Sequence, residues 1–258
     1  MSRRKKTQAY LEQAHLDFLN ENAKACSSTK SKIDTFKYIK PVNVHQKQFV
    51  KSIKQNQLTI GSGCAGTGKT LLALFTAIQL INNPESPIEK VSYIRANVDN
   101  REEKEIGALP GDLLEKVRHL AYPILDNLEL FMPSGTIEYL ISNERIEILP
   151  LMMMRGRSFN NRIVIVDECQ NIGPSSMKTI MTRICEDSKL VLIGDPDQCD
   201  IDPFKNGLKD LEWRLGRRLD MYEESGQNPE IDFDIIKFNK NDIIRSYVTK
   251  FAIDLYEL

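Results

Sequence analysis

The residues with the clearest chemical purpose form one glycine-rich segment, Gly63-Cys64-Ala65-Gly66-Thr67-Gly68-Lys69-Thr70. Glycines at this spacing let the backbone curl so that successive N–H groups point at phosphate oxygens. Lys69 then supplies a cation to the β- and γ-phosphates, and Thr70 supplies a hydroxyl to a magnesium ion. The segment follows a short apolar run and opens a helical pattern, which an accidental glycine-rich turn would not explain. It predicts a nucleotide site, with ATP and Mg²⁺ as the expected cofactors.

Two adjacent carboxylates, Asp167 and Glu168, follow the β-branched run 162–166. The carboxyl end of a parallel strand is where α/β proteins bind ligands, so Asp167 is a candidate magnesium ligand. Glu168 is then close enough to orient and deprotonate an attacking water. A kinase for a small substrate needs no such glutamate, because the substrate hydroxyl attacks. The pair therefore favours hydrolysis, with two solvated loop carboxylates as the alternative.

A third polar segment, Gly194 to Gln198, follows the apolar run 189–193. The side-chain amide of Gln198 can donate a hydrogen bond to the γ-phosphate or to the attacking water. Taken alone, Gly-Asp-Pro-Asp is an ordinary turn. Its position after a second apolar strand favours a role in sensing the γ-phosphate.

These segments need elements that hold them together, and strand and helix patterns alternate from Val44 onward. We expect strands at 58–60, 91–94, 145–149, 162–166, 189–193 and 233–238. We expect helices at 69–81, 113–128, 177–184 and 242–255. The alternation predicts an α/β fold of the P-loop NTPase type, with a mostly parallel, RecA-like sheet between helices.

The chain divides by texture into residues 1–40, a basic N-terminal arm, and residues 41–258, the predicted ATPase domain. Within the arm, apolar residues recur at helical spacing and predict a short helix; they are Leu11, Ala14, His15, Phe18 and Leu19. A solvated arm is the alternative to phosphate contacts by its basic tip.

Bulk properties exclude several classes of protein. No run approaches the roughly 20 apolar residues of a membrane span, and the basic start lacks the apolar run of a secretory signal. The five cysteines (Cys26, Cys64, Cys169, Cys185 and Cys199) are odd in number and show no C-x-x-C spacing. We therefore expect a reducing cytoplasm, with neither a disulfide framework nor zinc. The net charge of −1 leaves nucleic-acid binding to local patches, such as Arg155 with Arg157 or Arg217 with Arg218, unless these are solvated faces.

The three segments together resemble the PhoH family of P-loop ATPases, which is similar in core to superfamily 1 helicases. The resemblance covers about residues 41–258. Besides the three segments, the motifs that carry it are Val44-His45-Gln46, Gly107 to Asp112 with Glu115-Lys116, Arg155 to Asn160, Gln170-Asn171, Asp200 and Asp242 to Arg245. Such proteins are thought to act as oligomeric, ring-shaped ATPases on RNA. The resemblance thus implies single-stranded RNA as a partner and a homo-oligomer, in the form of a hexameric ring.

The resemblance also gives roles to two residues. Gln46 looks like the glutamine that reads adenine in related helicases, although from the residues alone it is a polar residue on a helix. Arg245 looks like an arginine finger, lying beside the apolar face of the predicted helix 242–255. A surface salt bridge is the alternative for Arg245, and the sequence does not say whether a finger would act in cis or on a neighbour.

The sequence departs from the family pattern at four positions. Cys64 and Ala96 stand where proline is usual, Cys169 where alanine is usual, and Ser246 where histidine is usual. None of these removes a phosphate, metal or water ligand. Because Cys64, Cys169 and Cys199 all adjoin the predicted site, we expect thiol reagents to block hydrolysis and bound nucleotide to protect, unless the three are simply small buried hydrophobes.

The sequence as a whole predicts a magnesium-dependent ATP hydrolase. Gln46 would read the base, the segment from Gly63 to Thr70 would hold phosphates and metal with Asp167, and Glu168, Gln198 and Arg245 would act on the γ-phosphate. Two other classes stay open. A P-loop kinase would transfer the phosphoryl group to an acceptor and would not need Glu168, and a nucleotide-controlled assembly protein would bind ATP with little turnover.

Overall fold

The computed structural model of the chain describes residues 33, 36–96 and 113–256. The chain forms two compact units, Met1–Asp34 and Thr35–Leu258, and the sheet and the candidate site both belong to the second unit. The helix expected in the N-terminal arm lies outside the described residues, as does the segment 107–112. The domain boundary at residues 40 and 41 stays a prediction.

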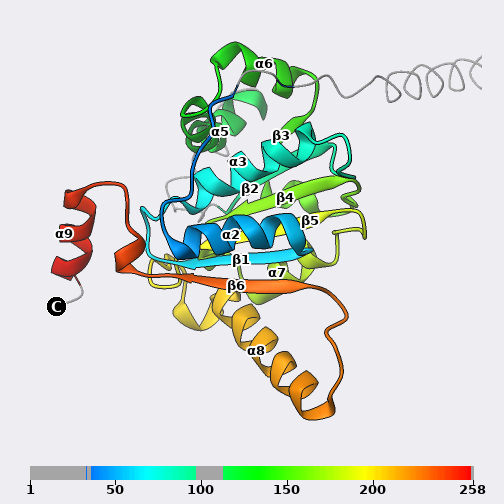
Figure 1. The fold of residues 1–258 in the computed structure, drawn as a ribbon, viewed down its shortest axis with the longest axis vertical. Coiled ribbons are helices and arrows are strands. Elements are labelled where there is room, and N and C mark those ends of the chain that lie inside the picture. The colour runs from blue at the N-terminus through cyan, green and yellow to red at the C-terminus, as the bar shows by residue number, and fades with distance from the viewer. Residues whose placement is uncertain (1–32, 34–35, 97–112, 257–258) are drawn as a thin grey trace, which may run out of the picture. The chain divides into compact units, whose positions relative to one another are not determined.

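One sheet of six described strands forms the centre of the second unit, in the order β3-β2-β4-β5-β1-β6 (Figure 1). The strands are β1 (Leu58–Gly63), β2 (Lys90–Arg95), β3 (Ile146–Pro150), β4 (Arg162–Asp167), β5 (Lys189–Gly194) and β6 (Phe233–Phe238). Every neighbouring pair runs parallel, so the expected parallel sheet is confirmed.

The described α-helices are α2 (Val44–Gln55), α3 (Lys69–Asn82), α5 (Leu113–Glu129), α6 (Ser134–Ser142), α7 (Pro174–Met181), α8 (Gly207–Ser225) and α9 (Tyr247–Tyr256). Helices α7 and α8 pack Met177 and Leu208 into one cluster with Val164 and Val166 of β4. Ile163 and Ile165, which alternate with these valines along the strand, are equally buried. Because alternate residues of a strand face opposite sides, β4 is covered on both faces. Helix α3 contacts both α2 and α5, and each of these three helices also contacts strands of the sheet (Figure 1). None of the described helices is both long and apolar enough to cross a membrane.

The register of the strands brings the three predicted segments to one edge of the sheet. Ser62 of β1 pairs with Gly194 of β5, and Arg95 of β2 pairs with Asp167 of β4. Strand β5 lies between β1 and β4. The phosphate loop, the acidic pair and the 194–198 loop therefore leave three consecutive strands at their carboxyl ends, where α/β proteins bind ligands.

Four helices, α6, α7, α8 and α9, differ from the prediction. Helix α7 begins at Pro174, three residues before the predicted start, because Gly173 caps it and proline suits the first helical position. It ends at Met181, and Ile184 instead forms a bridge with Phe159. Helices α6 and α8 were not predicted. The 19 residues of α8 begin after Asn206, whose side chain caps Leu208 and Lys209, and end at Gly226 in the left-handed conformation.

The predicted helix 242–255 was wrong at its start. A 3₁₀ turn (Lys240–Asp242) forms first, with Asn239 and Asp242 making a capping box. Ile243 then adopts an extended backbone, which interrupts the helix, and α9 begins only at Tyr247. The apolar face expected for this helix is exposed along Tyr247, Val248, Phe251 and Leu255.

Candidate functional site

The phosphate loop depends on glycine at two positions. Gly63 has a φ of +120°, and a Cβ there would lie 1.9 Å from the carbonyl oxygen of Phe238. Gly68 has a φ of +83° and is the N-cap of α3. Both backbones occupy a region that side chains disfavour, so the turn from β1 into α3 requires these glycines. The loop therefore directs its N–H groups and the α3 N-terminus towards one cavity.

Lys69 closes this loop from inside. Its side chain is buried, and its Nζ donates hydrogen bonds to the carbonyl oxygens of Gly63 at 2.6 Å and Cys64 at 2.7 Å. Burial lowers the pKa of the Lys69 ammonium, while the nearby carboxylates Asp195 and Asp167 oppose that shift. A buried cation beside a ring of N–H donors is a strong site for a polyanion, because little water screens it.

Asp167 is the most constrained carboxylate of the site. Its Oδ2 accepts hydrogen bonds from the hydroxyls of Thr70 at 3.0 Å and Tyr93 at 2.8 Å. Burial, together with the charge of Glu168, raises the pKa of Asp167, and these hydrogen bonds oppose the rise. Magnesium in nucleotide sites is held by one or two carboxylates together with phosphate oxygens and water. The Thr70 hydroxyl and the Asp167 carboxylate fit that donor set.

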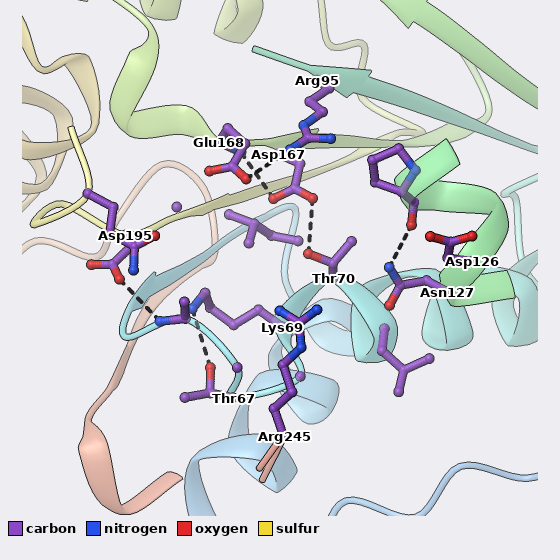
Figure 2. Close-up of a pocket in the computed structure, with 18 of the residues that line it drawn as sticks. Thr67, Lys69, Thr70, Arg95, Asp126, Asn127, Asp167, Glu168, Asp195 and Arg245 are labelled. Atoms are coloured by element: carbon purple, nitrogen blue, oxygen red, sulfur yellow. Dashed lines mark hydrogen bonds and ion pairs between the residues drawn. The ribbon is translucent and has the colours of Figure 1, made fainter. Parts of the chain in front are cut away.

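Glu168 is held in an unusual backbone conformation. Its φ of 59° is left-handed, which for a residue with a side chain costs about 1–3 kcal/mol and is typical of functional positions. Its Oε1 lies 3.4 Å from Nη2 of Arg95, and its Oε2 accepts a hydrogen bond from Nε2 of Gln170 at 2.8 Å. The carboxylate is therefore held from two sides, by Arg95 (Figure 2) and by Gln170.

Gln170 also joins the acidic pair to the 194–198 loop. Its side chain is buried, its amide donates a second hydrogen bond to the carbonyl oxygen of Gln198 at 3.1 Å, and its carbonyl oxygen accepts one from the Asp195 N–H at 3.1 Å. Asp195 in turn accepts a hydrogen bond from the N–H of Ala65 at 3.1 Å. One buried amide thus links the acidic pair, the 194–198 loop and, through Asp195, the phosphate loop.

A cavity of about 670 Å³ lies between these elements (Figure 2). Its lining brings together most of the predicted site residues, namely Ala65 to Thr70, Asp167, Glu168, Gln198 and Arg245. This volume lies within the range typical of small-molecule sites. Four lining residues of α5 and its end were not predicted: Pro123, Asp126, Asn127 and Leu130. Tyr93, Gln170 and Asp195 also contact the predicted site residues, and the sequence did not assign them a role. The position of Arg95 at the carboxyl end of β2 was a visible signal for that residue.

Arg245 lies at a bend in the non-helical segment before α9. The neighbouring Ile244 donates its N–H to the carbonyl oxygen of Gly66 at 3.0 Å. A Cβ added to Gly66 would lie 3.2 Å from the Cβ of Arg245. Arg245 is exposed and makes no ion pair within the described residues, so the alternative of a surface salt bridge finds no partner there. Its role as a finger stays a prediction.

Gln46 is buried at the start of α2 and does not line the cavity. Its Nε2 donates to the carbonyl oxygen of Thr67 at 2.9 Å, and its Oε1 accepts from the N–H of Val42 at 2.8 Å. Gln46 therefore ties the chain before α2 to the phosphate loop. A role in reading adenine stays a prediction.

The cysteines predicted near the site differ in how far they are buried. The four described cysteines form no disulfide; Cys64 and Cys199 are half-buried, while burial raises the pKa of the fully buried Cys169. The effect of thiol reagents stays a prediction.

Of the basic patches, Arg157 pairs with Glu147 at 2.8 Å, and Arg218 pairs with Glu230 at 2.7 Å. Each patch therefore has one arginine already neutralised by a carboxylate.

Comparisons with known proteins agree with this geometry. The family model described as PhoH-like protein matches residues 38–257. A PhoH-like protein of Bacillus subtilis (strain 168) is 36% identical over 200 residues, covering 77% of this chain and 58% of the relative. A PhoH-like protein of Synechocystis sp. is 39% identical over 165 residues, covering 64% and 49% of the two chains. Protein PhoH of Escherichia coli (strain K12) is 30% identical over 217 residues, covering 83% and 57%.

The chain thus spans about half to three-fifths of the length of these relatives. The parallel sheet, the phosphate loop and the matched family together give an α/β fold of the P-loop NTPase type. The chain belongs to the PhoH-like protein family.

Proposed function

We propose that this chain is a magnesium-dependent ATP hydrolase in which Glu168 directs a water molecule at the γ-phosphate. One observation carries the proposal. The hydrogen bond of 3.0 Å between Thr70 and Asp167 lies in the same cavity as the Glu168 carboxylate, which Arg95 and Gln170 orient. A metal-ligand pair beside an oriented carboxylate supports attack by water, because a kinase would need no base at that position.

The chain's own groups divide the work as follows. The loop N–H groups and Lys69 bind the phosphates, and Thr70 and Asp167 would hold Mg²⁺, which when bound neutralises charge on the β- and γ-phosphates. Glu168 accepts the proton of the attacking water. Gln198, exposed at the cavity, contacts the γ-phosphate or the water. For Gln46 to pair with the adenine edge, its amide would have to exchange its present hydrogen bonds with Thr67 and Val42.

Arg245 stabilises the charge that develops on the γ-phosphate in the transition state. Its position next to Gly66 of its own phosphate loop, at the same cavity, supports action in cis. This assignment leaves a neighbouring subunit with no required side chain at the γ-phosphate.

We further propose that the chain acts on single-stranded RNA in the cytoplasm, as a homo-oligomer in the form of a hexameric ring. The support is the resemblance to ring-shaped RNA-linked ATPases. The described residues hold one phosphate loop, so movement along a strand would require several subunits to cooperate.

The test is phosphate release by the purified chain with ATP and Mg²⁺, with and without single-stranded RNA, and with Lys69→Ala as the control. We expect release that RNA increases and that Lys69→Ala abolishes. A parent protein that binds ATP without releasing phosphate would remove the hydrolase proposal and favour an assembly protein. Phosphoryl transfer to an added acceptor, without release, would favour a kinase. If RNA does not change the rate of phosphate release, the hydrolase proposal stands and the proposal that the chain acts on RNA falls.

A further inference from the structure

The stretch from Phe36 to Gln57 contains five lysines and no aspartate or glutamate. The lysines are Lys37, Lys40, Lys47, Lys51 and Lys54, and all five are exposed. None of these lysines takes part in an ion pair within the described residues, although ten ion pairs occur outside this stretch. The positive charge of this face is therefore not balanced locally, unlike that of Arg157 and Arg218.

Three of these lysines share one side of α2. Lys47, Lys51 and Lys54 follow the spacing i, i+4, i+7, which aligns them on one helix face over roughly 10 Å of the axis. The opposite face buries Phe49 and Ile53 against the core. The helix is anchored on its apolar side, so the backbone holds the three lysines in a fixed row from which their ammonium groups extend.

A groove of about 450 Å³ runs between this row and the chain that precedes α2. We name it the lysine groove, and its lining residues are Tyr38, Lys40, Pro41, Lys47, Val50, Lys51, Lys54 and Gln55. The carboxylate of Asp234 lies just beyond the end of α2, where it accepts a hydrogen bond of 2.6 Å from Asn56, and it does not line the groove. Lys40 extends the row of charges onto the other wall.

Tyr38 gives the groove an aromatic surface. Two-thirds of the side chain is exposed, and the buried ring of Phe75 holds it in a T-shaped contact, with ring centroids 5.4 Å apart. An exposed but supported aromatic ring in a groove lined by lysines is the combination with which proteins bind single-stranded nucleic acids. Bases stack on the ring, and the cations follow the phosphates.

We propose that the lysine groove binds single-stranded nucleic acid, with phosphates along Lys47, Lys51 and Lys54 and a base stacked on Tyr38. The proposal rests on the proposed action on RNA and gives that partner a site. An acidic protein would match the lysines equally well but would not require a supported, exposed ring in the same groove.

The groove is also joined to the nucleotide site. Lys47 follows Gln46, whose amide holds the carbonyl oxygen of Thr67 in the phosphate loop. His45, one residue earlier, contacts Asp242 at 2.7 Å, at the base of the segment that carries Arg245. A nucleic acid that shifts the start of α2 therefore acts on both the phosphate loop and the Arg245 segment, which offers a route for RNA to change the rate of hydrolysis.

The experiment measures binding of a labelled oligouridine of about 15 nucleotides by fluorescence anisotropy over a range of salt concentrations. The variants are Lys47→Gln/Lys51→Gln/Lys54→Gln and Tyr38→Ala. Lys178→Gln/Lys205→Gln/Lys250→Gln is the matched control, because it removes the same charge from exposed lysines elsewhere. Thermal melting of each variant checks that it is folded.

We expect the α2 triple variant to bind at least tenfold more weakly. Its plot of log K against log salt should be shallower by roughly 2, since each single-strand phosphate contact contributes about 0.7. Tyr38→Ala should bind about tenfold more weakly with an unchanged salt slope, because stacking releases no counterions. The control should bind within about twofold of the parent.

Several results would overturn the proposal that the lysine groove binds nucleic acid. If the α2 triple variant binds like the parent, the nucleic acid binds elsewhere, while ATP hydrolysis and RNA stimulation stand on their own measurements. If the folded parent binds no oligouridine, the groove and the RNA proposal both fall, and phosphate release still decides hydrolysis. If the parent binds anionic lipid vesicles but no oligouridine, and the α2 triple variant loses the vesicles, the groove belongs to a membrane surface instead.

Discussion

The two walls of the nucleotide cavity are built in different ways. On the wall made by the strand ends, Asp167 is buried and its carboxylate accepts hydrogen bonds from Thr70 and Tyr93, while Glu168 is held by two neighbours. Among the remaining lining residues, which we call the outer wall, Arg245 is exposed, and so are Asp126 of α5 and Leu130 just after it. The groups that we propose for metal binding and water activation are therefore held in place before nucleotide arrives, whereas the outer wall can still adjust to it.

The largest effect should come from the outer wall. Arg245→Ala should lower kcat by about 10³–10⁵-fold, the range measured for arginine fingers, and change the affinity for ATP much less. The reason is that the guanidinium acts on charge that appears only in the transition state. Phosphate release and equilibrium binding of ATP, measured on the same preparation, check this. A kcat within about threefold of the parent would remove Arg245 from the transition state.

Mixed oligomers sharpen the same comparison. If Arg245 acts in cis, mixing Arg245→Ala with Lys69→Ala should restore no hydrolysis, because neither chain then holds a complete site. Recovered activity in the mixture would show that the arginine reaches a neighbouring subunit.

A smaller effect is expected where one amide orients the inner wall. Gln170→Ala removes the hydrogen bonds to Glu168, Asp195 and Gln198, so the carboxylate loses one of its two supports. We expect kcat to fall by roughly 10²-fold or less with KM nearly unchanged, because misplacing a catalytic group costs rate and not binding. Asn171→Ala, which removes a surface contact to Asp200, is the control. Equal effects of the two substitutions would contradict the orienting role.

The smallest effect is on stability. Burial raises the pKa of Asp167 above its ordinary value of 3.8, so the folded state holds this proton more tightly than the unfolded state. The contribution of Asp167 to the free energy of unfolding is therefore lost as pH rises above that value. Asp167→Asn should raise the Tm of the nucleotide-free protein at neutral pH by about 2–4 °C, although it weakens magnesium-dependent ATP binding.

Thermal melting across pH measures this effect, with the exposed Asp126→Asn as the control. The gain in Tm should shrink as the pH falls towards the ordinary value of 3.8, because the raised pKa lets the parent carboxyl take up a proton as well. A Tm that falls on Asp167→Asn at neutral pH would show that the hydrogen bonds from Thr70 and Tyr93 outweigh the cost of burying the charge.

The inner wall, made by the strand ends, could be predicted because each of its functional residues lies close in the sequence to the strand that positions it. The spacing from Gly63 to Thr70, the run before Asp167 and the strand before Gly194 each place a functional group within a few residues of a strand end. The register of a parallel sheet then brings such groups together. Even the bounds of β6 followed from its apolar pattern.

The outer wall was harder to predict because it depends on tertiary contacts. The start of α9 is displaced by a capping box at Asn239 and by the contact of Asp242 with His45, which lies 197 residues earlier in the chain. Helix α8 was not predicted because most of its residues are polar, so its buried positions Leu208 and Leu211 do not stand out as an apolar pattern. Tyr93 bonds to Asp167 of another strand, and Gln170 joins its neighbour Glu168 to the distant Asp195 and Gln198, so no local pattern contains either set of partners.

The most direct test of the central claim is phosphate release by Glu168→Gln at saturating ATP and Mg²⁺, compared with the parent. Glutamine keeps the size of the side chain and removes its ability to accept a proton. The account predicts a loss of about 10²–10⁴-fold in kcat, the usual contribution of a general base, with ATP bound as tightly as by the parent. A variant that releases phosphate at the parental rate would contradict it.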